Sequence, residues 1–199
     1  MLAERPVRVL SGIQPWWFIV IHLGKEIENR RKPVLGLDYL GDVLLHASKS
    51  KGKMADQQNW AAARGFVAER FGEALAARIP PIGYLPMGGI VGRATVTGVV
   101  RPMTTEYPGG VDKRWHMRES YGYLLKDPQE TPFVPWRGAQ AAVEAPAVLL
   151  AALARQAALS GTPYRGTCAR CGREALLVGD CCANQSICQT GQDGPDHYP

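Results

Sequence analysis

Three residues of complementary charge, Lys25, Glu28 and Arg30, lie within six positions of one another in the stretch HLGKEIENRRKP at residues 22–33. A lysine and an arginine held beside a glutamate can bind a phosphate or a base edge, while the carboxylate orients them or accepts a hydrogen from an exocyclic amine. As a base and acid pair, Glu28 and Lys25 could instead catalyse hydrolysis. The alternative is an exposed ion network of little energetic weight.

Further polar residues follow the cluster in the chain. His46, Ser48 and Lys49 stand where the apolar segment GDVLLHASK ends, and His46 is either a polar group on the floor of a cleft or a structural histidine at the end of a barrel. No Ser/His/Asp arrangement and no glycine-rich phosphate loop is apparent in the spacing. A set of basic residues could follow a phosphate backbone or could serve solubility only; it comprises Arg30, Arg31, Lys32, Lys49, Lys51 and Lys53.

The five cysteines all fall within the last 32 residues, which favours a local metal site or free thiols over a disulfide framework. Cys168 and Cys171 form a C-x-x-C followed by glycine, a turn that can direct two thiolates to one zinc ion. A tetrahedral site needs a second pair, for which Cys181 or Cys182 is available together with Cys188. The sequence thus predicts a structural zinc, through Cys168, Cys171, Cys182 and Cys188, and no organic cofactor.

Hydrophobic periodicity and turn residues predict the elements that position these side chains. Strands are expected over 6–12, 25–30, 40–50 and 88–102, followed by two strands over 121–128 and 130–146 with a turn at Asp127–Pro128. Helices are expected over 15–23, over 56–79 with Asp56 as N-cap, and over 146–159. Short strands curved by glycine, with few helices, indicate an α+β fold built on a small barrel.

The chain has 199 residues, a formal net charge of +5 and an isoelectric point near 9.0. These values suit one domain with an appendage and weakly favour an anionic partner, nucleic acid first. The expected domains are 1–160, a barrel, and 161–199, a cysteine-rich tail that could form a small zinc-ribbon-like module. No membrane span or secretion signal is recognised, so we expect a cytoplasmic protein with no membrane partner.

Four segments together resemble the ASCH domain (activating-signal-cointegrator homology domain) over roughly residues 7–146. They are VLSGIQPWWFIVIHLGKEIENRRKP, GDVLLHASK, GGIVGRATV and YGYLLKDPQETPFVPWRGA. The resemblance implies a PUA-like β-barrel with a cleft beside the first helix that binds RNA or modified nucleobases. Some ASCH proteins are nucleases, and one branch hydrolyses N4-acetylcytidine.

The family motif places a glycine two positions before a lysine, then a glutamate three positions on and an arginine two beyond. Lys25, Glu28 and Arg30 match it, whereas Leu23 stands at the glycine position and Gly24 follows one residue late. The acetylcytidine-hydrolysing branch carries threonine where this chain has Glu28. A glutamate has no hydroxyl to acylate, so the covalent route of that branch is not available at this position.

The resemblance also matches Gln14, Pro15 and Trp16 to a family QPW segment at the cleft, and so favours Trp16 over Trp17 as the tryptophan that stacks on a base. The sequence predicts a protein that binds RNA or a modified nucleotide. The predicted binding residues are Trp16, Lys25, Glu28, Arg30, His46, Ser48 and Lys49. Two alternatives stay open: a hydrolase of RNA or of a modified nucleoside, with Lys25 and Glu28 catalytic, and a protein-interaction adaptor that uses the tail.

Overall fold

The computed structural model describes residues 6–139, 141–160, 164–167, 174–178 and 181–182, with side chains described up to residue 159. The chain divides into two compact units, Met1–Leu150 and Ala151–Pro199. The boundary between the units falls within helix α4 (Ala147–Ser160), whereas the predicted domain boundary lies at the end of that helix. The predicted domains, 1–160 and 161–199, stay a prediction.

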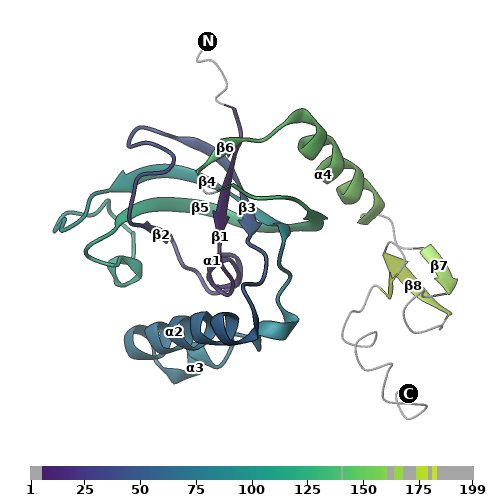
Figure 1. Ribbon diagram of the computed structural model, residues 1–199, viewed down its shortest axis with the longest axis horizontal. Coiled ribbons are helices and arrows are strands. Elements are labelled where there is room, and N and C mark those ends of the chain that lie inside the picture. The colour runs from purple at the N-terminus through teal and green to yellow at the C-terminus, as the bar shows by residue number, and fades with distance from the viewer. Residues whose placement is uncertain (1–5, 140, 161–163, 168–173, 179–180, 183–199) are drawn as a thin grey trace. The chain divides into compact units, whose positions relative to one another are not determined.

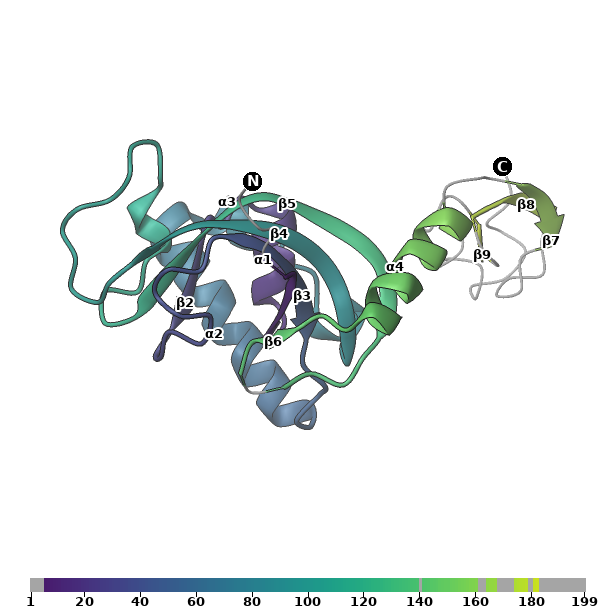
Figure 2. The same cartoon turned by 90° about the horizontal axis from the view of Figure 1, so that it is seen from above.

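A six-stranded sheet forms the frame of the first unit (Figure 1). Its strands run in the order β2-β5-β4-β3-β1-β6. Their bounds are β1 (Arg8–Gly12), β2 (Ile27–Arg30), β3 (Gly41–Ala47), β4 (Gly89–Val100), β5 (Tyr121–Pro135) and β6 (Val143–Glu144). Only β1 and β3 pair in parallel; the other neighbours are antiparallel. Figure 2 shows the long strands β4 and β5 curling together, which confirms the predicted α+β fold with a barrel-like sheet and flanking helices.

Helix α1 (Trp16–His22) lies between the curled sheet and α2 (Lys53–Phe71) (Figure 1). Its apolar residues face both ways, since Trp17 and Val20 join the core formed with the strands, while Ile19 joins a second core formed with α2. The short helix α3 (Glu73–Ala76) completes that second core. A helix that is apolar on most faces is buried on both sides, as its sequence predicts.

The predicted helix over 56–79 is wrong in its continuity and in its cap. The chain forms α2 and α3 with a break at Gly72, whose φ of 91° lies outside the range of a right-handed helix. Helix α2 begins at Lys53, so Asp56 lies in its first turn and is not the N-cap. The Asp56 carboxylate accepts hydrogen bonds from the Ser50 hydroxyl and the Lys51 amide and so holds the preceding loop.

The predicted turn at Asp127–Pro128 is also wrong, because β5 runs through it as one strand. Asp127 takes a φ of 49°, and the pairing with β4 shifts register there, between Arg93↔Gln129 and Thr95↔Lys126. Such an irregularity is a bulge, which accommodates a proline that cannot donate a ladder hydrogen bond. Bulges of this kind bend β5 and help the sheet to curl.

One glycine of β4 allows the sheet to close against α1. A Cβ at Gly92 would lie 2.6 Å from the side chain of Ile21 and 2.7 Å from the carbonyl oxygen of Gln129. The absent side chain therefore lets the first helix approach the sheet closely, which sets the depth at which α1 sits.

The second unit contains a three-stranded antiparallel sheet of β7 (Tyr164–Thr167), β8 (Glu174–Val178) and β9 (Cys181–Cys182). Cys168, Cys171 and Cys188 lie outside the described residues, and for Cys182 only the backbone is described. The zinc site therefore stays a prediction.

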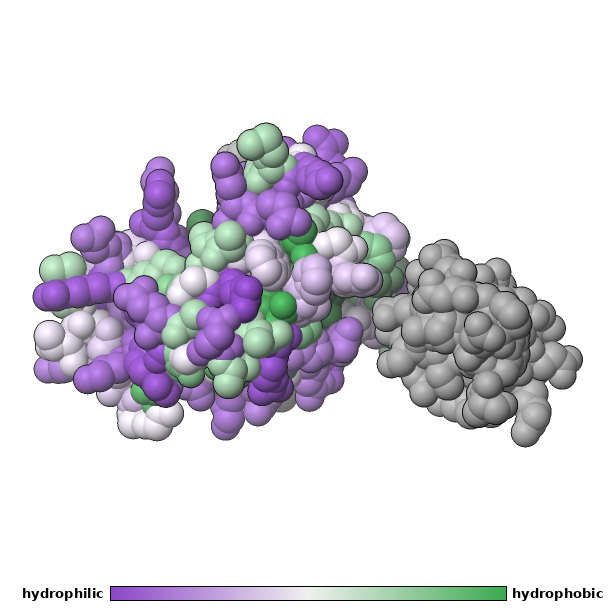
Figure 3. Space-filling model, turned by 90° about the horizontal axis from the view of Figure 1, so that it is seen from below, coloured by the Kyte–Doolittle hydropathy of each residue, from purple (hydrophilic) through white to green (hydrophobic). Residues whose placement is uncertain are grey.

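Figure 3 shows the molecule from below, relative to its orientation in Figure 1. The described part of this surface is mainly hydrophilic, with scattered hydrophobic residues. Among the described residues, no helix combines the length and the apolar character needed to cross a bilayer.

Candidate ligand-binding cleft

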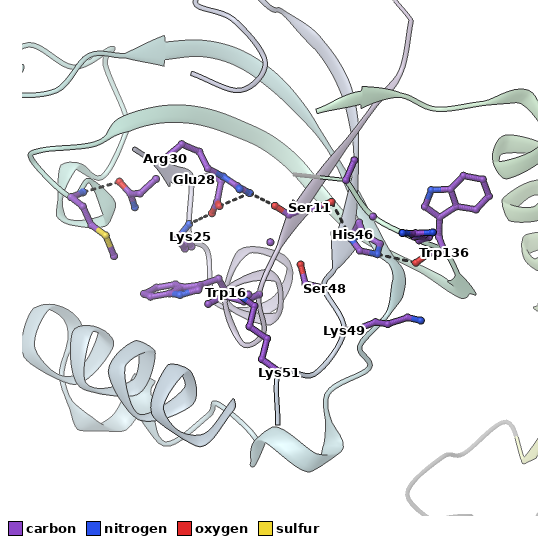
Figure 4. Close-up of a pocket in the computed structure, with 17 residues that line it drawn as sticks. Ser11, Trp16, Lys25, Glu28, Arg30, His46, Ser48, Lys49, Lys51 and Trp136 are labelled. Carbon is purple, nitrogen blue, oxygen red and sulfur yellow. Dashed lines mark hydrogen bonds and ion pairs between the residues drawn. The ribbon is translucent and has the colours of Figure 1, made fainter. Parts of the chain in front are cut away.

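A cleft of about 900 Å³ opens beside the start of α1, where the ends of β1, β2 and β3 meet the segment that follows β5. Its volume falls within the range of small-ligand sites. The lining residues are Ser11, Gly12, Ile13, Trp16, Lys25, Glu28, Asn29, Arg30, His46, Ser48, Lys49, Lys51, Met117, Trp136, Arg137, Gly138 and Ala139. The structure thus brings all seven predicted binding residues together in one cleft (Figure 4).

Lys25 and Glu28 are buried and Arg30 is half-buried, so the cluster is not the exposed ion network that the charge pattern also allowed. Lys25 is 2% exposed and Glu28 7% exposed. The Lys25 Nζ lies 2.7 Å from Glu28 Oε2, and an Arg30 terminal nitrogen lies 3.0 Å from Glu28 Oε1. The same Arg30 nitrogen donates to the Ser11 carbonyl at 2.7 Å. Each carboxylate oxygen of Glu28 therefore already has a cationic partner.

Burial and ion pairing act against each other in setting the protonation of the cluster. Burial alone raises the pKa of Glu28, but the adjacent Lys25 and Arg30 cations outweigh it and hold the pKa below its ordinary value. For Lys25, burial lowers the pKa and the attraction of Glu28 offsets that only in part. Glu28 is thus an ionised acceptor with both oxygens engaged, which suits it to orienting two cations more than to taking up a proton.

The turn between α1 and β2 places Lys25 next to the Glu28 carboxylate. Gly24 adopts a φ of 75° after the helix, and the Lys25 amide donates to the Ile19 carbonyl at 3.3 Å. Strand β2 begins at Ile27, two residues later than the strand predicted over 25–30. The Glu26 carboxylate accepts a hydrogen bond from the Asp112 amide at 2.9 Å.

The two adjacent tryptophans take different positions, as expected from the sequence. Trp17 is fully buried, and its indole nitrogen donates to the His46 carbonyl at 2.8 Å. Trp16 lines the cleft and is half-buried. Its ring makes an edge-to-face contact with that of Phe66, and the Lys25 Nζ lies 5.5 Å from its centroid. Base stacking by Trp16 stays a prediction.

The expected placement of Gln14 at the cleft is wrong. Gln14 is buried and does not line the cleft. Its amide donates to the Pro86 carbonyl at 3.2 Å and accepts from the Phe18 amide at 3.3 Å. The side chain therefore ties the start of α1 to the segment before β4.

His46 lies on the floor of the cleft at the end of β3, with Ser48 and Lys49 just beyond it (Figure 4). Burial lowers the pKa of His46 despite a hydrogen bond to the Trp136 carbonyl, so the ring is neutral at neutral pH. Among the basic residues of the sequence analysis, Arg30, Lys49 and Lys51 line the cleft, whereas Arg31, Lys32 and Lys53 do not.

Sequence reasoning missed several lining residues that come from distant parts of the chain. Trp136, Arg137 and Gly138 follow β5 and close one side of the cleft, and Met117 enters from the loop before β5. Asn29 holds that loop, because its amide donates to the Trp115 carbonyl and accepts from the Met117 amide, each at 2.8 Å. The segment WRGA was part of the family resemblance, but no local pattern indicated which of its residues reach the cleft.

The lining is strongly cationic. Five basic side chains face one carboxylate, so with His46 neutral the formal charge of the lining is +4. Lys49, Lys51 and Arg137 make no ion pair with any described residue, and the buried Nε of Arg30 has no hydrogen-bond partner there. Within the described part of the chain, no three His, Cys, Asp or Glu residues are grouped so that they could hold a metal ion.

Comparison with known proteins finds likeness at the level of the fold. No family model and no curated protein matches the chain. Among solved structures, the chain is similar to ASCH from Zymomonas mobilis, with 12% identity, a TM-score of 0.45, and coverage of 76% of this chain and 96% of that one. A variant of that ASCH protein matches with 14% identity, a TM-score of 0.43, and coverage of 76% and 98%. The matched structures are of the family that the sequence motif resembles.

Proposed function

We propose that this chain is an ASCH-domain protein that binds RNA or a modified nucleotide in the cleft headed by Lys25, Glu28 and Arg30. The observation that carries the proposal is the lining itself, which combines a formal charge of +4 with the ring of Trp16. A nucleotide matches both features, because its phosphate is anionic and its base can stack on an aromatic ring.

The phosphate is expected on the unpaired cations. Lys49, Lys51 and Arg137 have no ion-pair partner among the described residues, whereas Lys25 and Arg30 are already paired with Glu28. For single-stranded nucleic acid, each phosphate neutralised contributes about −0.7 to the slope of log K against log salt. Three such contacts predict a slope of about −2.

The base is expected beside Trp16 and the buried cluster. Stacking on one aromatic side chain contributes roughly 1–3 kcal/mol per base. The unpartnered Nε of Arg30 supplies a charged donor that an acceptor on a ligand could satisfy. Glu28 fixes the positions of Lys25 and Arg30, so its role in this proposal is to organise the two cations.

The geometry disfavours the hydrolase in which Lys25 and Glu28 act as acid and base. A general base needs a lone pair within reach of the substrate proton and a pKa near the working pH. Both oxygens of Glu28 already face cations, and its pKa is lowered, so it does not meet the second condition. The adaptor alternative depends on the cysteine-rich tail, most of which lies outside the described residues.

Fluorescence anisotropy of the full-length protein with a short labelled single-stranded RNA, over a salt series, tests the proposal. We expect binding at low salt, with the Lys49→Ala/Lys51→Ala variant weakened and its salt slope reduced by about 1.4. The matched control is Arg31→Ala/Lys32→Ala, which removes the same charge from exposed residues outside the cleft.

Equal weakening of the two double variants would show that net charge and not the cleft attracts the RNA. Absence of binding at low salt to RNA, single-stranded DNA and free nucleotides alike would refute the proposal. Parallel titrations with the three ligand types identify which of them the cleft prefers.

A further inference from the structure

A chain of hydrogen bonds crosses the floor of the cleft through Ser11, His46 and Trp136. These three residues have no joint role in the proposed nucleotide binding. Ser11 on β1 and His46 on β3 are direct neighbours in the parallel pairing, and the Ser11 hydroxyl lies 3.1 Å from His46 Nδ1. On its other side, His46 Nε2 lies 3.0 Å from the Trp136 carbonyl oxygen. Figure 4 shows both interactions beside the labelled cleft residues.

The carbonyl fixes the direction of the hydrogen bonds. A carbonyl oxygen can only accept, so Nε2 of His46 carries the proton and donates to Trp136. Nδ1 of the neutral ring is then an acceptor, and the Ser11 hydroxyl donates to it. A hydroxyl that donates to a neutral histidine, which is itself oriented by a third group, is the arrangement that activates serine nucleophiles.

The surroundings keep this pair in place and beside a cation. A Cβ at Gly138 would collide with the His46 ring and come within 2.7 Å of the Ser11 hydroxyl, so the glycine is needed for the pair to exist. The Arg30 guanidinium donates to the backbone carbonyl of Ser11 at 2.7 Å, which places a positive charge next to the serine. Ser11 and His46 both line the cleft, where Ser11 is half-buried and His46, 3% exposed, lies behind it.

We propose that Ser11 is a nucleophile and His46 its general base, and that they hydrolyse a carboxylic ester of a ligand bound in the cleft. The Ser11 oxygen attacks the ester carbonyl carbon while its proton passes to Nδ1 of His46. The bond from carbon to the alcohol oxygen then breaks, and His46 returns the proton to the departing alcohol. Water, deprotonated by His46, cleaves the acyl-serine and yields the acid and free Ser11.

This activity goes beyond the proposed nucleotide binding and does not require it, since it rests on a different set of side chains in the same cleft. The cationic lining favours esters that also carry a negative charge. Lys49 and Lys51, which line the cleft without ion-pair partners in the described part of the chain, are suited to attract such substrates.

The test is covalent labelling of the full-length protein with a fluorophosphonate, read by intact mass and by mapping the modified peptide. Attack by Ser11 forms an oxygen–phosphorus bond and releases fluoride, with the serine proton taken up by His46. We expect one label per chain, on Ser11, and none in Ser11→Ala. Loss of the base in His46→Gln should slow labelling by roughly 100-fold or more.

The matched control is Ser120→Ala, a serine outside the cleft, which should label at the wild-type rate. Tryptophan fluorescence confirms that each variant is folded. If wild-type protein carries no label on Ser11, or if folded His46→Gln labels as fast as wild type, the dyad is refuted. Labelling is read without RNA, so the esterase proposal and the binding proposal can fail independently.

Discussion

The substitution Glu28→Gln tests whether the cluster of Lys25, Glu28 and Arg30 is a desolvated unit. Glutamine keeps the shape and one acceptor oxygen but removes the charge that compensates two cations. The Lys25 side chain is 1% exposed and would lose its ion-pair partner, whereas Arg30 keeps its hydrogen bond to the Ser11 carbonyl and is 19% exposed. Removing one partner of a buried ion pair typically costs 3–5 kcal/mol.

We expect a loss near the lower end of that range, about 3 kcal/mol, because Arg30 is partly solvated and glutamine can still accept one hydrogen bond. The assay is urea unfolding followed by tryptophan fluorescence. All five tryptophans, Trp16, Trp17, Trp60, Trp115 and Trp136, belong to the first unit, so the signal reports on that unit alone.

Two companion variants decide how the result is interpreted. Glu119→Gln removes an exposed carboxylate that has no ion pair with a described residue, and should change the unfolding free energy by less than about 0.5 kcal/mol. Lys25→Met/Glu28→Gln removes the stranded ammonium as well, and should be more stable than Glu28→Gln alone. A loss below about 1 kcal/mol for Glu28→Gln would show that the cluster behaves as a solvated surface network and would refute the reasoning.

Three further predictions follow from burial, packing and the cysteine pattern. Burial lowers the pKa of His46 from its ordinary value of 6.5, so the unfolded chain binds more protons at this residue than the folded chain does. The unfolding free energy should therefore fall as the pH drops below about 6.5. An NMR titration of the His46 ring, and unfolding curves of wild type and His46→Gln over this pH range, check the prediction. Gly12→Ala places a Cβ 2.6 Å from the Trp17 ring and should cost about 1–3 kcal/mol, whereas Gly65→Ala, in open space on α2, should be stabilising in the same urea assay. Elemental analysis should find one zinc per chain in wild type and none in Cys168→Ser, and a metal-free wild-type protein would refute the predicted zinc site.

The elements that form from local patterns were predictable. The apolar run at residues 15–23 predicted α1, and the alternating, glycine-containing segment predicted β4, because period and turn residues report directly on neighbours in the chain. The predicted elements were wrong where the backbone conformation of one residue outweighed the pattern of apolar and turn residues around it. Gly72 divides one apolar stripe into two helices, and Asp127 takes a bulge conformation where a proline suggested a turn.

The sequence by itself determined the composition of the charged cluster, since Lys25, Glu28 and Arg30 are close in the chain and any local fold keeps them near one another. Tertiary structure decided that the cluster is buried, because solvent is excluded only when α1 and the sheet pack around it. It also decided the pairing of Ser11 with His46 and the approach of Trp136, residues separated by 35 and 90 positions that meet only when β1, β3 and β5 enter one sheet. Contacts between residues so far apart in the chain produce no periodic pattern in a single sequence. The proposed esterase site depends on such contacts.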